Sequence, residues 1–564
     1  VDFNEQHPYR TLQANMGGGA RITGSQVTAR SAYEEGEVAH NIRLYEGWVA
    51  ATLPLNNPQQ NVKITAGRQL LHWGEAVFLG THSLNIINPP DVNRLSSPGG
   101  GFEEMPQPVE LLTADWVFNP VAQLRGFYQL KWQGAIVPTP GSFFSTTDFG
   151  TQVQPDDFAV LQAKTPEDPL RLGRPSGTIN GRLAGTSSSI GRYANNTPRN
   201  GGQWGLKFQY DADSSWQTRM GVYAANYHSR LPYLSTMAGQ YSCADVRHDA
   251  TSRAADINNN GSIDHAAEYV AACQGRLERT VRADTVKLFF DYPEDIQMYG
   301  LSFNTKLGGL MPVAGEWAYR PNQPVQIDTG DLVNAALQPS FPQRTLDVAS
   351  LGITIPGRRL AVPDVSQTLS LGKGINGIVS CYDNQTPGAA PRAVNLKTDP
   401  CIQRGYTRLA VSQPNLQFTI GFERHWGIEL MALITEVGAT WVHNLPDQTR
   451  LPLEVPGSDT AYTAGSNGYD SAGRILDANG NFAGAICQDP SGYGTQAELN
   501  DSVSGPYGTA ACGLRLNSEN ANPAYRVTEF SWGYRLFSLV KFEPWAPGVY
   551  FEPWFIYIKD VKGT

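Results

Sequence analysis

The sequence predicts an all-β protein: a large antiparallel transmembrane β-barrel of about 14–18 strands, within the size range of bacterial outer-membrane barrels. Three observations predict this fold class. Side chains alternate with a period of two in many segments, short and long connections alternate along the chain, and no apolar run reaches the roughly 18–20 residues of a membrane-spanning helix. The 564 residues also include 57 Gly and 38 Pro, which interrupt helices.

The alternation of side chains is clearest in two segments. From 121 to 132 the even-numbered side chains are mostly apolar or aromatic, whereas the odd-numbered ones include Gln123, Arg125 and Lys131. The segment 527–542 repeats this division between even and odd positions. An apolar face with Trp and Tyr opposite a polar face is expected of a strand between lipid and a wet lumen. A soluble β-sandwich, in which the aromatic face would turn toward a core, is the alternative that this pattern leaves open.

Strand-like segments recur along the whole chain, 1–564, which we expect to form one barrel domain. They lie near 21–33, 42–54, 60–73, 108–118, 120–133, 203–212, 214–228, 281–292, 296–306, 310–320, 366–379, 405–422, 428–443, 524–541 and 548–558. Short turns are expected at one end of the barrel, and long external loops at the other, namely 134–202, 229–280, 380–404 and 444–523. The number of these strands is odd, whereas single-chain bacterial barrels are generally even. Either one segment is misassigned or closing strands are missing from this chain.

The six cysteines fall into three successive couples, each within a stretch rich in Gly, Asn, Asp or Ser. The couples are Cys243 with Cys273, Cys381 with Cys401, and Cys487 with Cys512. This clustering favours pairing within each couple. All three couples fall in predicted long loops, so we expect disulfides that staple those loops in an oxidising compartment. The chain opens without an initiator Met or an apolar signal segment, which predicts a mature product whose export signal has been removed.

Ordered sequence blocks make the chain similar to a known family. Residues 63–109 read KITAGRQLLHWGEAVFLGTHSLNIINPPDVNRLSSPGGGFEEMPQPV. Further blocks are FYQLKW (127–132), PGSFFSTTDF (140–149), YPEDIQMYGLSFNT (292–305), GEWAYRPNQPVQI (315–327), TEVGATW (435–441), SWGYRL (531–536) and KDVKGT (559–564). Together they resemble the Gram-negative family catalogued as "domain of unknown function 1302", whose members show GRQ…WGE, INPxD and PG…E…PV blocks at similar spacing. Family members continue past the DVKG block through further strands, which agrees with the odd strand count.

The resemblance implies a bacterial outer-membrane barrel associated with moving hydrophobic molecules. The implied cargo class is lipids, sterols or fatty esters. The genes of such proteins often lie near those of a periplasmic lipoprotein-like partner and an inner-membrane pump of the lipid-exporter type. Such a barrel would also contact membrane lipid and lipopolysaccharide. Because the sequence encodes no energy source, we expect transport to be diffusive or driven by the periplasmic partner.

The connection 74–107 differs from the other long connections because it combines an Asn-, Pro- and Gly-rich sequence with a run of side chains able to pair. Irregular backbone at membrane depth is tolerated only inside a protein or along a wet cavity. We therefore hypothesise that this segment folds into the lumen as a plug or constriction; another external loop is the alternative. The candidate residues for solute passage are Arg68, Gln69, Trp73, Glu75, Asn88, Asp91, Arg94 and Glu104. We expect Arg68 to pair with an acidic residue such as Glu75, Asp91 or Glu104.

A second candidate site begins at Asp256, in the sequence DINNNGSID followed by Glu268. Oxygen donors at loop positions one, three and five, with Gly at six, match the calcium-loop pattern, because alternate oxygens converge on one hard cation. The predicted structural Ca²⁺ ligands are Asp256, Asn258, Asn260, Ser262, Asp264 and Glu268. Position twelve is Ala267, so Glu268 or Asp264 would have to supply the final carboxylate. The alternative is an Asn/Gly-rich turn closed by Cys243 and Cys273.

Charge and motifs argue against several other functions. The net charge is −9, so nucleic acid is not an expected partner. The sequence has no GxSxG, HExxH or Walker motif, so we expect neither an enzyme nor an organic cofactor. The predicted function is thus an outer-membrane channel or transporter for a hydrophobic or amphipathic small molecule. A surface-exposed binding or structural protein with a sealed lumen is the alternative, and an outer-membrane lipid hydrolase with a Ser–His pair is a third possibility.

Overall fold

The structure is a computed structural model, which describes the chain from residue 44 to residue 563 with several gaps. The longest gaps are 137–157, 161–188, 274–284, 356–377, 383–390 and 455–526, and shorter ones include 79–82 and 97–104. The predicted segment 21–33 and most of 366–379 lie outside the described residues.

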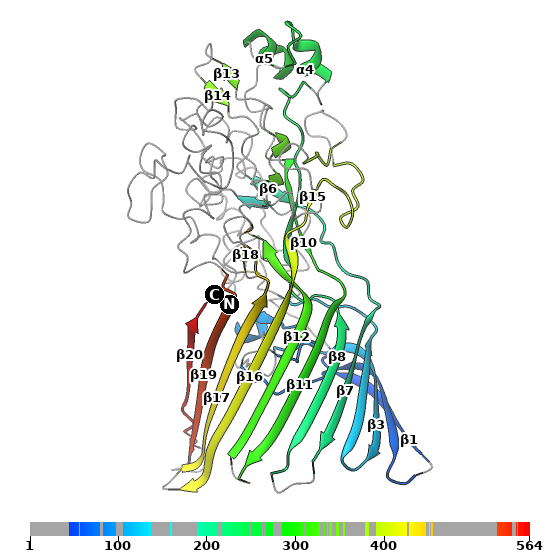
Figure 1. Cartoon of the computed structure of the whole chain (residues 1–564), viewed down its shortest axis with the longest axis vertical. Coiled ribbons are helices and arrows are strands. Elements are labelled where there is room, and N and C mark those ends of the chain that lie inside the picture. Colours follow the sequence, from blue (N-terminus) through cyan, green and yellow to red (C-terminus); the bar gives the residue numbers. More distant parts are fainter. Residues whose placement is uncertain are drawn as a thin grey trace.

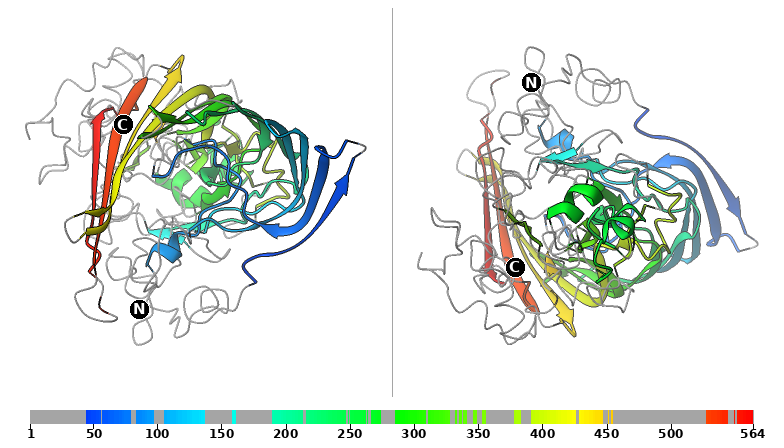
Figure 2. Two further views of the ribbon diagram at one scale, coloured as in Figure 1. Left: turned by 90° about the horizontal axis from the view of Figure 1, so that it is seen from below. Right: turned by 90° about the horizontal axis from the view of Figure 1, so that it is seen from above.

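One large antiparallel sheet of 13 strands dominates the fold (Figure 1). Its order is β1 (Gly47–Pro54), β2 (Asn61–Gln69), β3 (Val109–Asn119), β4 (Ala122–Gln129), β7 (Gln203–Asp211), β8 (Arg219–Tyr227), β11 (Ile296–Leu307), β12 (Met311–Ile327), β16 (Tyr406–His425), β17 (Ile428–His443), β19 (Phe530–Phe542) and β20 (Trp554–Lys562). The short β18 (Leu453–Glu454) pairs with β12. An all-β fold with a large antiparallel sheet is therefore confirmed. The sheet curves strongly (Figure 2), but no pairing joins β1 to β20 within the described residues, so closure into a barrel stays a prediction.

Short and long connections lie at opposite ends of this sheet. Hairpins such as β3–β4 and β16–β17 are short and lie at the lower end in Figure 1. The connections from β4 to β7, from β8 to β11 and from β12 to β16 are long and leave from the other end. This division follows the predicted alternation along the chain.

A second, five-stranded sheet lies beyond the end that carries the long connections (Figure 1). Its order is β15 (Ile402–Gln403), β9 (Tyr233–Met237), β10 (Lys287–Asp291), β6 (Ser189–Arg192) and β5 (Phe158–Val160). The expectation that 281–292 is a barrel strand is wrong, because β10 pairs with β9 and β6 and not with the large sheet. Its apolar residues pack under the loops instead: Phe289 belongs to a buried cluster with Met237 and the Cys381–Cys401 disulfide.

The remaining regular elements are small. They are the strand pair β13 (Leu346–Val348) and β14 (Ile353–Ile355), the helices α4 (Ala250–Ala255) and α5 (Ala266–Cys273), and the 3₁₀ turns η3 (Val92–Ser96) and η7 (Gln338–Ser340). In the described part of the chain, no helix has the length and apolar character needed to cross a membrane.

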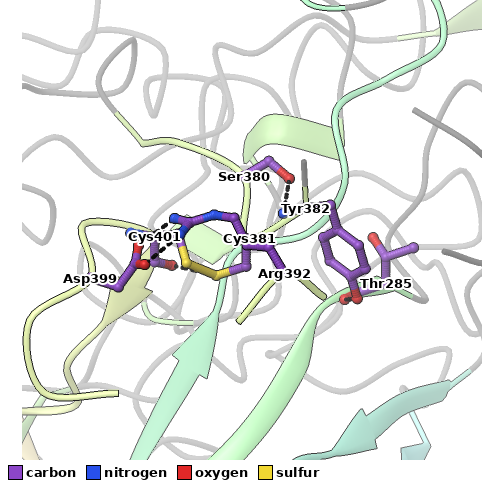
Figure 3. Close-up of a disulfide and its surroundings, with 7 residues drawn as sticks. All are labelled: Thr285, Ser380, Cys381, Tyr382, Arg392, Asp399 and Cys401. Atoms are coloured by element: carbon purple, nitrogen blue, oxygen red, sulfur yellow. Dashed lines mark hydrogen bonds and ion pairs between the residues drawn. A yellow bond between two sulfur atoms is a disulfide. The ribbon is translucent and has the colours of Figure 1, made fainter. Parts of the chain in front are cut away.

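Two of the three predicted disulfides are present, Cys243–Cys273 and Cys381–Cys401. The third couple, Cys487 and Cys512, lies outside the described residues. Beside the second disulfide, Arg392 and Asp399 form two hydrogen bonds of 2.6 and 2.5 Å, and the Tyr382 hydroxyl donates to the Thr285 carbonyl at 2.6 Å (Figure 3). The disulfide therefore lies next to the second sheet, in a loop region that side-chain hydrogen bonds also hold together.

The two faces of the large sheet differ as the alternation predicts. On one face, apolar and aromatic side chains of β3, β4, β7, β8, β11 and β12 are exposed: Leu112, Trp116, Tyr128, Trp204, Leu206, Phe208, Tyr210, Met220, Val222, Tyr299, Leu301, Phe303 and Trp317. On the other face, their sequence neighbours are buried and many are polar, among them Thr113, Gln129, Gln203, Ser302, Glu316 and Arg320. We call the first the outer face and the second the inner face.

Candidate functional site

We call the connection between β2 and β3, residues 70–108, the inward segment. Its described parts 71–78 and 83–87 lie against the inner face of the large sheet (Figure 2). β2 and β3 are paired neighbours, with Gln69 opposite Val109, so a tight turn could have joined them. The chain instead makes a long excursion, and an irregular backbone of this kind must find partners for its N–H and C=O groups.

Glu316 on β12 supplies several of those partners. Its Oε1 accepts a hydrogen bond from the N–H of Leu84 at 2.9 Å, and its Oε2 accepts from the N–H of Ala76 at 3.2 Å and from that of Glu75. The carboxylate is buried and lies on β12 between its ends at Met311 and Ile327. The inward segment is therefore bonded to the sheet at strand depth and not only at its rim.

Glu436 on β17 makes a second set of bonds to the same segment. Its carboxylate accepts from the N–H of Val77 at 3.2 Å and from that of Phe78 at 2.6 Å. The side-chain amide of Asn415, on the neighbouring β16, donates to it at 2.6 Å. Charge-assisted bonds to backbone N–H groups are about twice as strong as neutral ones, so two buried carboxylates can fix an otherwise irregular stretch.

Arg320 lies on the same face of β12 as Glu316 and donates a hydrogen bond to a backbone carbonyl of the inward segment. Its Nη2 donates to the Ser83 carbonyl at 2.7 Å, its Nε donates to the Tyr227 hydroxyl at 3.1 Å, and its Nη1 donates to Gln413. Glu75 of the segment reaches back to the sheet, because its Oε2 accepts from the Asn304 amide at 2.9 Å. Donors and acceptors of the segment are thus both matched by strand side chains.

Apolar packing accompanies these bonds. The Trp73 ring is buried between the rings of Phe127 and Tyr223, at centroid distances of 5.0 and 5.6 Å. Leu84 packs directly on β11, where a Cβ at Gly300 would lie 2.2 Å from Leu84 Cδ2. A side chain at position 300 would require Leu84 to shift. Leu71, Leu84 and Ile87 belong to one buried cluster with strand residues such as Leu111 and Met298.

Hydrogen bonds within the inward segment fix its other half. Asn88 accepts from the Leu71 N–H at 3.0 Å and donates to the Gln107 carbonyl at 2.8 Å. Asp91 forms an ion pair with Arg94 at 3.4 Å. Five of the predicted residues therefore make contacts within the segment or between the segment and the sheet: Trp73, Glu75, Asn88, Asp91 and Arg94. Glu104 lies outside the described residues.

The predicted pairing of Arg68 with an acidic residue is wrong for Glu75 and Asp91. Arg68 Nε donates to the Tyr45 carbonyl at 3.1 Å, and no ion pair of Arg68 occurs among the described residues. The reason is the period of two: Gln69 is buried on the inner face and donates to the Leu111 carbonyl at 3.2 Å, so Arg68 lies on the opposite face.

Sequence reasoning missed the residues that hold the segment: Glu316, Arg320 and Glu436. The signal was present, because Glu316 and Arg320 share one face of the GEWAYR block and Glu436 lies in TEVGATW. A carboxylate or a guanidinium on the inner face of a strand requires a partner there. Which partner it would find could not be read from spacing, since these partners are more than 200 residues away along the chain.

Arg230, which follows β8 in the chain, forms hydrogen bonds to two other strands of the large sheet, near the inward segment. Its guanidinium donates to the side-chain oxygens of Gln129 at 2.5 Å and Gln203 at 2.9 Å, and burial lowers its pKa to about 10. No carboxylate forms an ion pair with it among the described residues; amide oxygens accept from its two terminal nitrogens, and its Nε has no hydrogen-bond partner there. This buried group ties β4 and β7 together where the long connections begin.

The predicted calcium loop is partly described. Asp256 accepts from the N–H groups of Asn260 at 3.2 Å and Gly261 at 2.9 Å, and the buried Glu268 accepts from the Ile257 N–H at 3.0 Å. Ser262 and Asp264 lie outside the described residues. Within the described part, no three or more His, Cys, Asp or Glu side chains are grouped as a metal site would require. Calcium binding by this loop stays a prediction.

One Ser–His contact bears on the hydrolase alternative. Ser412 Oγ and His443 Nε2 lie 2.8 Å apart, and the His443 ring stacks on Trp441 at 5.1 Å. No acidic residue pairs with His443 in the part of the chain that the structure describes. A hydrolytic triad needs such a group to orient the imidazole, so this pair provides only two of the three parts.

Comparisons with known proteins were made on sequence and on structure. A solved structure, "Crystal structure of the outer membrane channel DcaP of Acinetobacter baumannii", matches with 8% sequence identity over 91% of this chain and 77% of that chain, at a TM-score of 0.25. These values are too low to support an argument about function. No curated protein matches the sequence. The family described as "Protein of unknown function (DUF1302)" matches residues 2–564, and the chain therefore belongs to the DUF1302 family.

Proposed function

We propose that this protein is an outer-membrane channel or transporter in which the inward segment controls passage of a hydrophobic or amphipathic small molecule, of the lipid, sterol or fatty-ester class. The observation that carries the proposal is the depth of the segment. Its backbone is bonded to Glu316 and Glu436, which lie between the ends of their strands. A segment at that depth narrows any path that a solute could take along the inner face of the sheet.

The outer face supports a membrane location. Exposed apolar patches much larger than a few hundred Å² are uncommon on soluble monomers and mark surfaces that other apolar matter covers. Here, exposed Trp, Tyr, Phe and Leu side chains continue over six strands of the sheet, including Trp204, Phe208 and Leu301. An apolar outer face opposite a polar inner face is the arrangement of a barrel in lipid.

The disulfides and connections support one orientation in that membrane. In outer-membrane barrels, short turns face the periplasm and long loops face the exterior. The two described disulfides lie in the connections from β8 to β11 and from β12 to β16, both on the long-loop side. We therefore assign that side to the exterior. The proposal also requires closure of the sheet, because free strand edges in lipid leave unpaired N–H and C=O groups.

The tip of the inward segment supports an apolar component in the solute. Val77 is 54% exposed although it is bonded through its N–H to the inner-face Glu436. Phe78 contacts Phe537 of β19 at a ring-centroid distance of 5.5 Å. Apolar side chains exposed beside the interior favour contact with an apolar group of a passing molecule.

Conductance measurements test this proposal. Purified protein in planar bilayers is compared with a variant in which 75–86 is replaced by a short Gly-Ser linker, with Glu552→Gln as a control away from the segment. We expect a small conductance in the wild type and the control, and a several-fold larger one in the linker variant. If all three proteins stay impermeable, the lumen is sealed and the structural alternative is favoured. Turnover of lipid esters would favour a hydrolase.

A further inference from the structure

Charged side chains form a row on the inner face across β2, β3, β4 and β7. The strand register places Lys63 opposite Asp115, Asp115 opposite Arg125, Arg125 opposite Lys207, and Lys207 opposite Tyr223. Residues directly opposite in antiparallel strands share a face. Tyr223 packs against Trp73 of the inward segment, so the whole row lies on the inner face.

The charges of this row do not balance. Asp115 is paired with Arg125, which leaves the two lysines. Lys207 Nζ lies 5.3 Å from the centre of the Tyr223 ring, and Lys63 Nζ lies 5.9 Å from that of Trp48. Neither lysine forms an ion pair with any carboxylate among the described residues. Aromatic faces attract cations but leave their charge in place.

Nearby charges compensate this excess only in part, because Glu75 of the inward segment attracts Lys207 without forming an ion pair with it among the described residues. Asp211 is paired with Arg219 at 2.8 Å. The carboxylates of Glu316 and Glu436 are buried and accept hydrogen bonds from N–H groups of the inward segment. Lys63 is exposed, whereas Lys207 is half-buried. The row thus keeps an excess of positive charge, with a lysine at each of its two ends.

We propose that this row, which we call the cationic row, binds the anionic group of the solute, so that the preferred solute is an amphipathic anion. This inference rests on the proposed channel function and names the chemical class of its solute. Clefts lined by charge of one sign concentrate ions of the opposite sign. The row supplies the attraction for a carboxylate or phosphate, and the apolar part of the solute contacts the exposed Val77 and the half-buried Phe78 farther along the inner face, at β17 and β19.

Ion selectivity in planar bilayers tests the proposal. The reversal potential in a KCl gradient is measured for the wild type, for Lys63→Gln/Lys207→Gln, and for Lys397→Gln. Lys397 is an exposed lysine outside the large sheet that pairs with Glu294, and it serves as the matched control. We expect anion preference in the wild type and the control, and a permeability ratio lowered about threefold in the double variant.

Block of the channel current by a simple amphiphile tests whether the preferred solute is an amphipathic anion. Decanoate should reduce the chloride current of the wild type more strongly than decanol does, and this difference should disappear in Lys63→Gln/Lys207→Gln. Equal block by the two compounds, or selectivity unaffected by the double substitution, overturns the inference. A protein without any conductance contradicts the proposed channel function itself, so the two failures are distinguishable.

Discussion

The backbone N–H of Leu84 donates to Oε1 of Glu316 at 2.9 Å, joining residues 232 positions apart. The same carboxylate also accepts from the N–H groups of Glu75 and Ala76. One buried side chain on β12 therefore holds two stretches of the inward segment, at residues 75–76 and at residue 84.

Glu316→Gln should loosen the inward segment without unfolding the sheet. The amide keeps one acceptor but turns an NH₂ group toward backbone donors, and bonds to a charged group are worth roughly 1.5–3 kcal/mol. We expect the protection of the Leu84 and Ala76 amides against hydrogen exchange to fall by one to two orders of magnitude. Glu552→Gln, at an exposed ion pair with Lys541, should leave it unchanged. Unaltered protection in Glu316→Gln would argue against a holding role for the carboxylate.

Stability should depend on the protonation of Asp291, in the second sheet. Burial raises the pKa of its carboxyl to about 6 from an ordinary value of 3.8. Between those two values the folded protein binds a proton that the unfolded chain has released, so the contribution of this group to stability is fully present below about pH 4 and is lost as the pH rises through 6. The change is about 3 kcal/mol at most. Thermal unfolding in detergent at pH 4.5 and 7.5 should show this decline.

Asp291→Asn is the matched variant for that experiment. The amide cannot ionise, and it retains an oxygen able to accept from Asn196, whose side-chain amide lies 2.8 Å from the Asp291 carboxylate. This component of the decline between pH 4.5 and 7.5 should be absent in the variant. An unchanged pH dependence would show that other groups cause it.

Removal of the Cys381–Cys401 disulfide should destabilise the second sheet and leave the large sheet folded. Both cysteines are buried, and Cys401 directly precedes β15, which pairs with β9. Closing a loop of this size contributes roughly 3 kcal/mol through the unfolded state. Cys381→Ser/Cys401→Ser should therefore show faster proteolysis within the long-loop region. Channel conductance should change little. A collapse of the strand signal in circular dichroism would contradict the separation of the two sheets.

Calcium should bind to the loop that begins at Asp256. Carboxylate and amide oxygens suit this cation, and extracellular sites bind it in about the 10⁻⁴–10⁻³ M range. Titration calorimetry of the whole protein should show heat of binding that disappears in Asp256→Ala. The bonds that Asp256 and Glu268 accept from the loop backbone already order this turn. Absence of heat in the wild type would identify it as a structural turn.

The sequence predicted the strands better than the contacts between distant segments. Alternation assigned the two faces of β4, where Tyr128 is exposed and Gln129 is buried, because period-two patterns follow directly from backbone geometry. It also indicated that the connection 74–107 differs from the other long connections. It did not identify Glu316 or Glu436 as partners, because such contacts depend on the curvature of the whole sheet. Segment 281–292 was misassigned because a strand under the loops has the same apolar character as one in the large sheet.

A cross-link between the inward segment and β11 tests the central claim most directly. Leu84 and Gly300 lie within one side-chain length of each other, since a Cβ at Gly300 would lie 2.2 Å from Leu84 Cδ2. In membrane-inserted Leu84→Cys/Gly300→Cys, we predict a disulfide that joins the two peptides in mass spectrometry after mild oxidation. Leu84→Cys paired with Leu301→Cys, on the outer face, should not cross-link. If the segment lay outside the sheet, the two introduced thiols at positions 84 and 300 would stay unjoined, and that result would contradict the account.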